Sequence, residues 1–530
     1  MSELNLKESI KKLNQIGIAL SSETNLVRLL SLVVREARTF TRADAGSLYI
    51  RDGDRLCFEV AQNDTLERRG GSDAQAFKPF PVPLTRTSIS GFVALTGKVL
   101  NIDDVYDLDA DESVEFSFNR EFDRRNNYRS RSMLAVPMLD HRHENIGVLQ
   151  LINALDDKGE VVPFAQEVEE LVLSLASQAA VAIRNAKLID DIKKIFAALV
   201  EYSASAIDAR SPHTAGHSRR VAAMSLLLAE AVSRQTEGRF AQTFFTPEEL
   251  EELSYAAWLH DIGKIGVREQ VLDKAGKLAP DRMALVEARF QRIDLALRLE
   301  FQNRILALYR TGEPKPDEVS VLEKEKKARL IELEQDLALI TRLNQPGWIN
   351  DEEAARLREI AAKEFKIEDG RTIRCLDDFE LENLSVRKGN LTRTEYEEMQ
   401  SHVVMTHDIV KKIPFTQELA RIPLFAAAHH EMLNGTGYPH RLKADEIPIQ
   451  ARILGVVDIF DALVARDRPY KKAMPVEKAL EILWAEVKAG RLDHDLVDLF
   501  IREGIGSEET VNMLSRQEER PLAGRNEADR

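Results

Sequence analysis

Hydrophobic residues recur at two different spacings along the chain, and the change between them separates an N-terminal α+β region from a helical remainder. Apolar positions recur at helical spacing over residues 1–20 and 25–39. Shorter apolar runs follow, and the Asp52-Gly53 pair between two of them is typical of a β-hairpin turn. Two more runs, SRSMLAVPML and ENIGVLQLINA, predict two further strands. We therefore predict an α+β domain over residues 1–165.

A long helix is predicted over residues 166–205. Its apolar residues step alternately by four and three, which is the heptad repeat of a coiled coil. No proline or glycine interrupts it, so we expect a stiff connector. The repeat predicts a parallel coiled coil in a homodimer, and the alternative is that this face packs on the N-terminal domain of its own chain. The seam residues are Val168, Val172, Leu175, Ala179, Ala182, Ala186 and Ile189.

The pattern from residue 206 to residue 505 is almost wholly helical and predicts an all-α domain. Within it, residues 281–380 carry two long apolar stripes separated by the turn TGEPKPD. That arrangement predicts an antiparallel helical hairpin with a charged exterior. The hairpin contains no histidine, so we interpret it as structural or partner-binding. Residues 506–530 are polar and predict a C-terminal tail.

Composition supports a multidomain globular protein. The 530 residues exceed one ordinary domain, and 44% of them are hydrophobic. A net charge of −15 argues against general nucleic-acid binding, although a local basic pocket remains compatible with it. The two cysteines, Cys57 and Cys375, cannot form a disulfide scaffold and fit a reducing compartment. The polar N-terminus is no signal peptide, and no apolar run approaches the roughly 18 residues of a membrane span. We expect a soluble cytoplasmic protein that does not bind membranes.

The histidines indicate metal chemistry in the helical region, where nine of the eleven lie. His213 and His217 are four residues apart, so a helix places both on one face. In the adjacent pair His260-Asp261, the imidazole can bind one metal while the carboxylate bridges to a second. Asp458 lies in an apolar helix, where an unpaired carboxylate is costly. A single histidine on a helix is usually a packed or surface residue, so the prediction rests on the ordered set: His217, His260, Asp261, His402, His429, His430 and Asp458.

Imidazoles combined with carboxylates suit Fe, Mn, Zn or Ni better than Mg or Ca. Two such metals can hold a bridging hydroxide and clamp a phosphate for in-line attack. His407 follows His402 by five residues, about 140° around a helix, so we favour His402 as the ligand. His141 and His143 lie in a polar turn and are interpreted as solvated.

Four segments of the chain resemble the signature of the HD-GYP family, a branch of the HD-domain phosphohydrolases. They are HTAGHSRRVA, HDIGKIGV, HHEMLNGTGYP and ARILGVVDIFDALVARDRPYKK, and the resemblance covers about 200–275 and 385–505. It implies an all-helical domain with two or three metals, often iron or manganese. It also implies cleavage of cyclic di-GMP to linear pGpG and sometimes to GMP. The turns at 274–280 and 387–392 both resemble a single family turn, so residues 281–380 are interpreted as an insertion.

The resemblance assigns further roles to individual residues. Lys264 would act beside Asp261 in catalysis, contacting the scissile phosphate and stabilising developing charge. The loop Gly437, Tyr438 and Pro439 would shape the substrate pocket. Arg468 and Lys471 would face the substrate phosphates, and without the family they would be interpreted equally well as a solvated basic patch. His213 stands where three-metal members carry Glu, which leaves a third metal site open. Asn434 replaces a common Asp but removes no ligand.

The N-terminal domain resembles a GAF domain, a class of sensory domain. Asn153, Phe164 and Glu169 fit a pattern of cyclic-nucleotide-binding members, whereas Ala154 and Val168 replace charged residues of that pattern. A cyclic nucleotide, another small molecule, or dimerisation without a ligand are all compatible with this sequence.

Three functions are therefore compared. The leading one is a cyclic-dinucleotide phosphodiesterase regulated by a GAF domain. The second is hydrolysis of another nucleotide messenger, such as cyclic GMP-AMP or a hyperphosphorylated guanosine, the last being disfavoured by the Gly-Tyr-Pro loop. The third is a catalytically silent signalling adaptor, which the full set of candidate ligands argues against.

Overall fold

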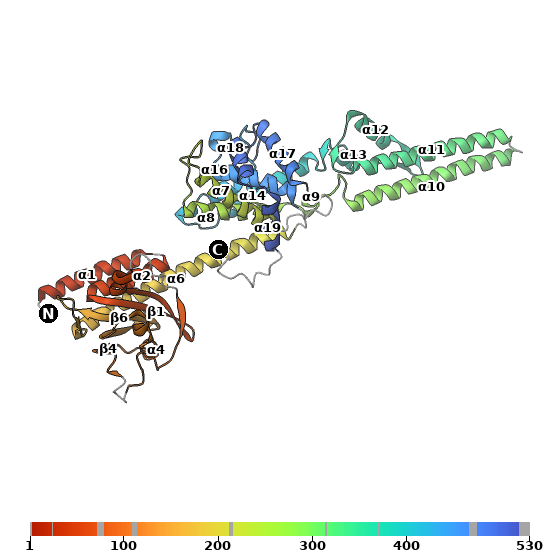
Figure 1. Ribbon diagram of the computed structural model, residues 1–530. Coiled ribbons are helices and arrows are strands. Elements are labelled where there is room, and N and C mark those ends of the chain that lie inside the picture. Colours follow the sequence, from red (N-terminus) through yellow and green to blue (C-terminus); the bar gives the residue numbers. More distant parts are fainter. Residues whose placement is uncertain are drawn as a thin grey trace. The chain divides into compact units, whose positions relative to one another are not determined.

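The computed structural model describes residues 3–23, 25–70, 79–108, 114–210, 216–312, 315–367, 370–465 and 474–518. Two compact units divide the chain, Met1–Phe196 and Ala197–Arg530 (Figure 1). The first is α+β and the second almost wholly helical, so the predicted fold class is confirmed. Among the described helices, none combines the length and the apolar character that a bilayer span requires.

The first unit is built on an antiparallel sheet in the order β3-β2-β1-β6-β5-β4, with β7 paired to β6. Gly53, at a φ of +56°, forms the predicted turn between the first two strands. The elements are α1 (Glu3–Ser22), α2 (Leu26–Thr41), β1 (Ala43–Asp52), β2 (Arg55–Asn63), α3 (Asp64–Gly70), β3 (Phe80–Pro83), α4 (Ile89–Thr96), β4 (Leu100–Ile102), α5 (Glu121–Asn126), β5 (Met133–Leu139), β6 (Asn145–Leu155), β7 (Val161–Val162) and α6 (Gln166–Asp208).

The sheet has a separate apolar core on each face, because successive strand residues point to opposite sides. In β6, Leu149 and Leu151 join the core under α1, α2 and α6, whereas Val148 joins the core under α4. Burial on both faces explains why the apolar runs of β5 and β6 are nearly continuous.

The helix α6 confirms the predicted long helix but not its predicted seam. Val172, Leu175, Ala179 and Ala186 are almost fully buried, and they belong to the core that α6 forms with α1, α2 and the sheet of its own unit. These positions are therefore not free to pair with a second chain. The prediction that this seam forms the coiled coil was wrong, because a heptad repeat does not distinguish an intramolecular partner from an intermolecular one.

Among its described residues, the second unit is helical apart from two short two-stranded sheets, β8 with β11 and β9 with β10, which were not predicted. The first part of the segment predicted as a polar tail forms a helix that buries Leu514. The helices are α7 (His217–Ser233), α8 (Pro247–Leu259), η3 (Ile262–Gly266), α9 (Glu269–Leu272), α10 (Pro280–Thr311), α11 (Pro316–Leu343), α12 (Asp351–Ala362), α13 (Asp378–Leu384), α14 (Arg393–Val410), η4 (Gln417–Leu419), α15 (Ile422–Ala427), η5 (Ala444–Glu446), α16 (Ile449–Val464), α17 (Val476–Lys488), α18 (His494–Arg502) and α19 (Glu508–Glu518), and the strands are β8 (Gly347–Trp348), β9 (Glu364–Lys366), β10 (Thr372–Arg374) and β11 (Lys388–Gly389).

The predicted hairpin is formed by α10 and α11, which lie side by side (Figure 1). It shares a core with α12 and α13 that includes Phe290, Ile293, Leu297 and Ile340. The residues before and after the hairpin lie next to each other, because the side chain of Asn390 donates a hydrogen bond to the carbonyl of Lys274. This arrangement is what an insertion between those two residues would produce.

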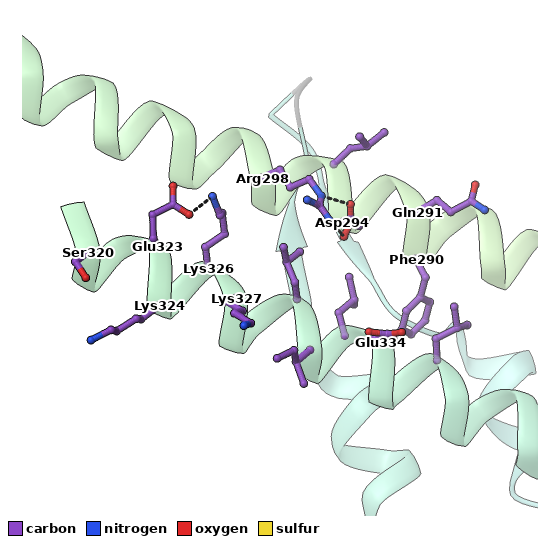
Figure 2. A pocket seen from close by; sticks show the side chains of 15 residues that line it. Phe290, Gln291, Asp294, Arg298, Ser320, Glu323, Lys324, Lys326, Lys327 and Glu334 are labelled. Carbon is purple, nitrogen blue, oxygen red and sulfur yellow. Dashed lines mark hydrogen bonds and ion pairs between the residues drawn. The ribbon is translucent and has the colours of Figure 1, made fainter. Parts of the chain in front are cut away.

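An open groove of about 930 Å³ runs along the hairpin between α10 and α11. Figure 2 shows that charged side chains of both signs line it, with Arg298 paired to Asp294 and Lys326 paired to Glu323. The described lining side chains include no histidine, cysteine or tyrosine. The groove is therefore chemically unlike the predicted metal site.

We expect Arg289→Met to lower the free energy of unfolding by about 3 kcal/mol. Arg289 donates to both carboxylate oxygens of Glu380, at 2.5 and 3.0 Å, and Glu380 is fully buried. The substitution would leave the buried carboxylate of Glu380 without the cation that pairs with it, which destabilises the folded state. Urea unfolding would measure the loss, and metal content should be unchanged.

Arg298→Met is the matched control, because Arg298 pairs with Asp294 at the surface of the same helix. Its cost should stay below about 1 kcal/mol. Equal costs for the two variants would contradict the importance of the buried pair.

Candidate metal centre

The seven predicted ligands converge in the second unit, although they are up to 241 positions apart in sequence. They form overlapping clusters in which the ligand atoms of each three lie within 4.8 Å of one another. One cluster is His217, His260 and Asp458, another is His260, Asp261 and His429, and the third is His402, His429 and His430. Six of the seven residues are buried, and His430 is partly exposed. The overlap joins the three groups into one cluster of candidate metal ligands.

Asp261 lies between His217 and His260 on one side and His402 on the other, with one oxygen directed to each side. Its Oδ2 is 3.5 Å from Nε2 of His217 and 3.4 Å from Nε2 of His260. Its Oδ1 is 3.4 Å from Nε2 of His402. Asp458 is arranged similarly, with Oδ1 3.3 Å from His217 Nε2 and Oδ2 3.9 Å from His430 Nδ1. This geometry supports a bridging role for the Asp261 carboxylate.

Three of the histidines are oriented by the backbone of their own segment. The Nδ1 atoms of His260, His402 and His429 lie 2.7, 2.6 and 2.6 Å from the carbonyl oxygen three residues earlier. A carbonyl can only accept, so each Nδ1 must carry the proton. Each Nε2 is then directed into the cluster and, when unprotonated, offers the lone pair that binds a metal.

His217 is oriented differently because it is the first residue of α7 and has no preceding helical turn. The carboxylate of Asp461 orients this ring instead, because its Oδ2 lies 2.8 Å from His217 Nδ1. Arg220, one turn along α7, donates to both oxygens of Asp461 at 2.8 and 3.1 Å. All three side chains are buried. Sequence analysis missed Asp461, although its position three residues after Asp458 in an apolar helix was the available signal.

The donor set fits metal ions better than it fits a network of hydrogen bonds. Nε2 of His402 and Nε2 of His429 are buried and have no hydrogen-bond partner among the described residues, which is unusual for buried polar atoms. Burial, together with the neighbouring His430, holds the pKa of His429 well below its usual range. Burial also lowers the pKa of His430 to about 4. Both imidazoles are therefore neutral near pH 7, as metal ligation requires.

A close backbone contact brings Asp261 to His402. The hydroxyl of Thr406 in α14 donates to the carbonyl of His260 at 2.9 Å and accepts from the amide of Gly263 at 3.0 Å. A Cβ on Gly263 would lie 1.9 Å from the carbonyl oxygen of His402. Only glycine permits this approach, so the HDIGK segment and α14 are fixed against each other.

The Gly-Tyr-Pro loop adjoins the histidine cluster. The ring of Tyr438 packs on His430 with centroids 4.8 Å apart, and the Tyr438-Pro439 peptide is cis. A Cβ on Gly437 would lie 2.3 Å from the amide of Met432, so glycine is needed there. The buried carboxylate of Glu431 holds the segment just after the loop by accepting from the amides of His440 and Leu442, at 2.7 and 2.8 Å. Lys264 pairs with Oδ2 of Asp261 at the edge of the cluster.

Some predicted residues are not at this centre or not described. His213, Arg468 and Lys471 lie outside the described residues, so their roles remain predictions. The side chain of His407 is 43% exposed and lies beside Asp408, which supports the choice of His402.

The three candidate GAF ligand residues have separate environments. Asn153 is buried, with its amide donating to Tyr128 and to the carbonyl of Arg129 and its oxygen accepting from the amide of Arg131. Phe164 belongs to the core under α1, α2 and α6. Glu169 is partly exposed in the first turn of α6. Asn153 and Phe164 thus have structural roles that account for them without a ligand.

Family models match both units. A GAF domain model matches residues 25–183, and two HD domain models match residues 214–349 and 379–496. The chain therefore contains a GAF domain followed by HD-type helical sequence, which confirms both resemblances. Among solved structures, a GAF domain from an Acinetobacter phosphoenolpyruvate-protein phosphotransferase is 18% identical over 36% of this chain and 98% of that one, with a TM-score of 0.27.

Several characterised relatives are similar to the helical part. A 3'3'-cGAMP-specific phosphodiesterase 3 of Vibrio cholerae is 45% identical over 18% of this chain and 20% of its own length. A cyclic di-GMP phosphodiesterase response regulator of Xanthomonas campestris is 35% identical over 26% of this chain and 36% of its own. A cyclic di-GMP phosphodiesterase of Thermotoga maritima is 37% identical over 23% and 32%. The chain thus matches between a fifth and about a third of the length of these relatives.

We expect Asp461→Asn to weaken metal binding by about 10- to 100-fold. The amide would remove the negative charge that orients and strengthens His217 as a ligand. Metal content measured by mass spectrometry against a graded chelator would show the shift. Asp498→Asn is the control, because it makes the same charge change at an exposed pair with Arg502.

Equal metal affinity in the two variants, with both folded by circular dichroism, would contradict the role of Asp461.

Proposed function

We propose that the chain is a metal-dependent phosphodiesterase that hydrolyses a cyclic dinucleotide, with cyclic di-GMP as the leading substrate. The observation that carries the proposal is the position of Asp261, whose two oxygens face two separate groups of histidines. A site for two metals a few ångströms apart is the arrangement used to cleave phosphate esters. The relatives named above act on cyclic di-GMP or 3'3'-cGAMP.

His217, His260 and Asp458 would hold one metal, His402, His429 and His430 would hold the other, and Asp261 would bridge them. When bound, the pair would supply an activated water and a Lewis acid for the phosphate, and iron or manganese suits the donors. A third ion would need the undescribed His213. In the reaction a water oxygen bonds to phosphorus, the P–O3' bond breaks, and a proton passes to the departing 3' oxygen. Linear pGpG is then the first product, and a second hydrolysis gives GMP.

Lys264 supplies positive charge from the protein itself. Burial opposes its charge, but the Asp261 carboxylate raises the pKa of Lys264 above its usual value, so the ammonium persists at neutral pH. Its side chain is 20% exposed, which leaves it able to reach a phosphate oxygen. We assign it to stabilisation of the charge that develops on that phosphate. Tyr438, whose ring packs on His430, would contact the substrate, and Arg468 and Lys471 would bind its phosphates.

A hybrid cyclic GMP-AMP is the second candidate substrate, favoured by the match to the Vibrio cholerae enzyme. Hydrolysis of both dinucleotides side by side, with the metal-loaded full chain, distinguishes the two. The GAF domain would regulate the rate through a small molecule, for which a cyclic nucleotide is one candidate. We place the protein in the cytoplasm, where such messengers occur.

We expect Asp261→Ala to lower the rate of cyclic dinucleotide hydrolysis by more than about 100-fold, because the bridge between the two metal positions is lost. Hydrolysis would be followed by separating pGpG and GMP from the substrate. His407→Ala is the control, since His407 is an exposed histidine on α14, and it should retain the full rate. Near-normal hydrolysis by Asp261→Ala would refute the proposed centre.

We expect Lys264→Gln to lower kcat by roughly 100-fold while leaving metal content unchanged. The amide keeps much of the side-chain length but removes the charge directed at the phosphate. Parallel measurement of bound metal and kcat separates this role from ligation. A loss of metal proportional to the loss of rate would show that Lys264 supports the metal site instead.

A further inference from the structure

The residues at the end of α6 contact two segments of the second unit that carry predicted metal ligands. The helix ends at Asp208, and Arg210 follows two residues later, both within the second unit. The side chain of Asp208 is only 4% exposed, so its carboxylate needs hydrogen-bond donors from the protein. Ser218 supplies two of them, because its amide and its hydroxyl each donate to one carboxylate oxygen at 3.0 Å.

The contact with Ser218 fixes the first turn of α7, which begins at His217. Gly216 precedes the helix at a φ of +68° and has no side chain that could cap it. The first amides of a helix have no acceptor within the helix, and a carboxylate is favourable beside them. Asp208 therefore caps α7 from another helix and fixes the backbone that carries the His217 ring.

Arg210 contacts the other segment, the short helix η3. Its Nη1 donates to the carbonyls of Lys264 and Ile265 at 3.0 and 2.6 Å, and its Nη2 donates to the carbonyl of Val267 at 2.9 Å. Carbonyls near the end of a helix need donors from outside it, and the rigid fork of a guanidinium can reach several at once. Thr406 holds the start of the same segment, so η3 is held at both ends.

We propose that Asp208 and Arg210 are positioning residues of the metal centre. Their contacts join the α7 segment to the HDIGK segment through roughly 7 Å of chain, because the two residues are only two positions apart. Oδ2 of Asp261 lies 3.5 Å from Nε2 of His217, so a displacement of either segment would separate two candidate ligands of one ion. The inference rests on the proposed metal-dependent function and adds to it two residues that touch neither metal nor substrate.

The affinity of the full chain for Mn²⁺ tests the role of Arg210. Arg210→Lys keeps the positive charge, but one ammonium nitrogen cannot replace two guanidinium nitrogens that reach three carbonyls. We expect the apparent dissociation constant, measured against a graded chelator, to rise about tenfold. Arg387→Lys is the matched control, since Arg387 also donates to backbone carbonyls, those of Ile349 and Asn350 just before α12. Its Mn²⁺ affinity should equal that of the wild type.

Asp208→Asn tests the other contact in the same assay. One carboxylate oxygen becomes an amide nitrogen that cannot accept, so one of the two hydrogen bonds from Ser218 is lost. We again expect the Mn²⁺ dissociation constant to rise about tenfold. Asp377→Asn is the control, because Asp377 caps α13 by accepting from the amide of Glu380. It should leave Mn²⁺ binding unchanged.

The visible absorption spectrum at saturating Co²⁺ provides a readout of ligand geometry that a general loss of stability does not change. It should differ from the wild type in Arg210→Lys and Asp208→Asn and match it in the two controls, with all chains folded by circular dichroism. Wild-type affinity and spectrum in either variant, or an equal change in its control, would overturn the inference and leave the proposed function intact. A wild-type chain that binds neither ion would overturn both.

Discussion

The metal centre depends on two carboxylates, those of Asp261 and Asp458, buried among histidines. An anionic side chain removed from water must be compensated by nearby positive charge. Lys264 supplies part of it, and the imidazoles supply more wherever they are protonated. Burial lowers the pKa of His260, but Asp261 and Asp458 raise it overall to about 9. A proton on the His260 ring and a metal ion bound to it are therefore alternative sources of the positive charge that Asp261 and Asp458 need, and the two compete for the ring nitrogen.

The ligand side chains are held in position by other parts of the protein, and most of these contacts are made by the backbone. Three of the rings are oriented by backbone carbonyls of their own segment. His217 is the first residue of its helix and has no such carbonyl, so the carboxylate of Asp461 orients its ring. Gly263 and Thr406 then lock the HDIGK segment to α14. Lys274 adds an ion pair to Glu395 at the start of α14. Since α14 is anchored at these points, a long hairpin can intervene between residue 274 and residue 390 without displacing His402.

The candidate ligands could be predicted from the sequence because few residue types bind transition metals and their order along the chain was informative. The choice of His402 over His407 needed only the angle between them on a helix. The residues that orient the ligands were missed, because Asp461 and Arg220 are chemically ordinary until their partners are known. Asn153 shows that a residue can match a ligand motif and also have a structural role. It fits a motif for a ligand, yet its amide holds together the backbone at Arg129 and Arg131.

Helix α6 shows that the spacing of apolar residues identifies the face of a helix that is apolar but does not identify what packs against that face. The helix carries two heptad stripes, and both meet the pattern of a coiled coil. The earlier one contains Ala179, Ala182 and Ala186, small residues that allow α1 and α2 to approach closely within one domain. The later one consists of larger side chains that are exposed: Leu188, Ile192, Ile195, Leu199 and Tyr202. Small side chains suit a helix packed tightly in its own core, so residue size along the repeat carries information about the partner that the spacing alone does not.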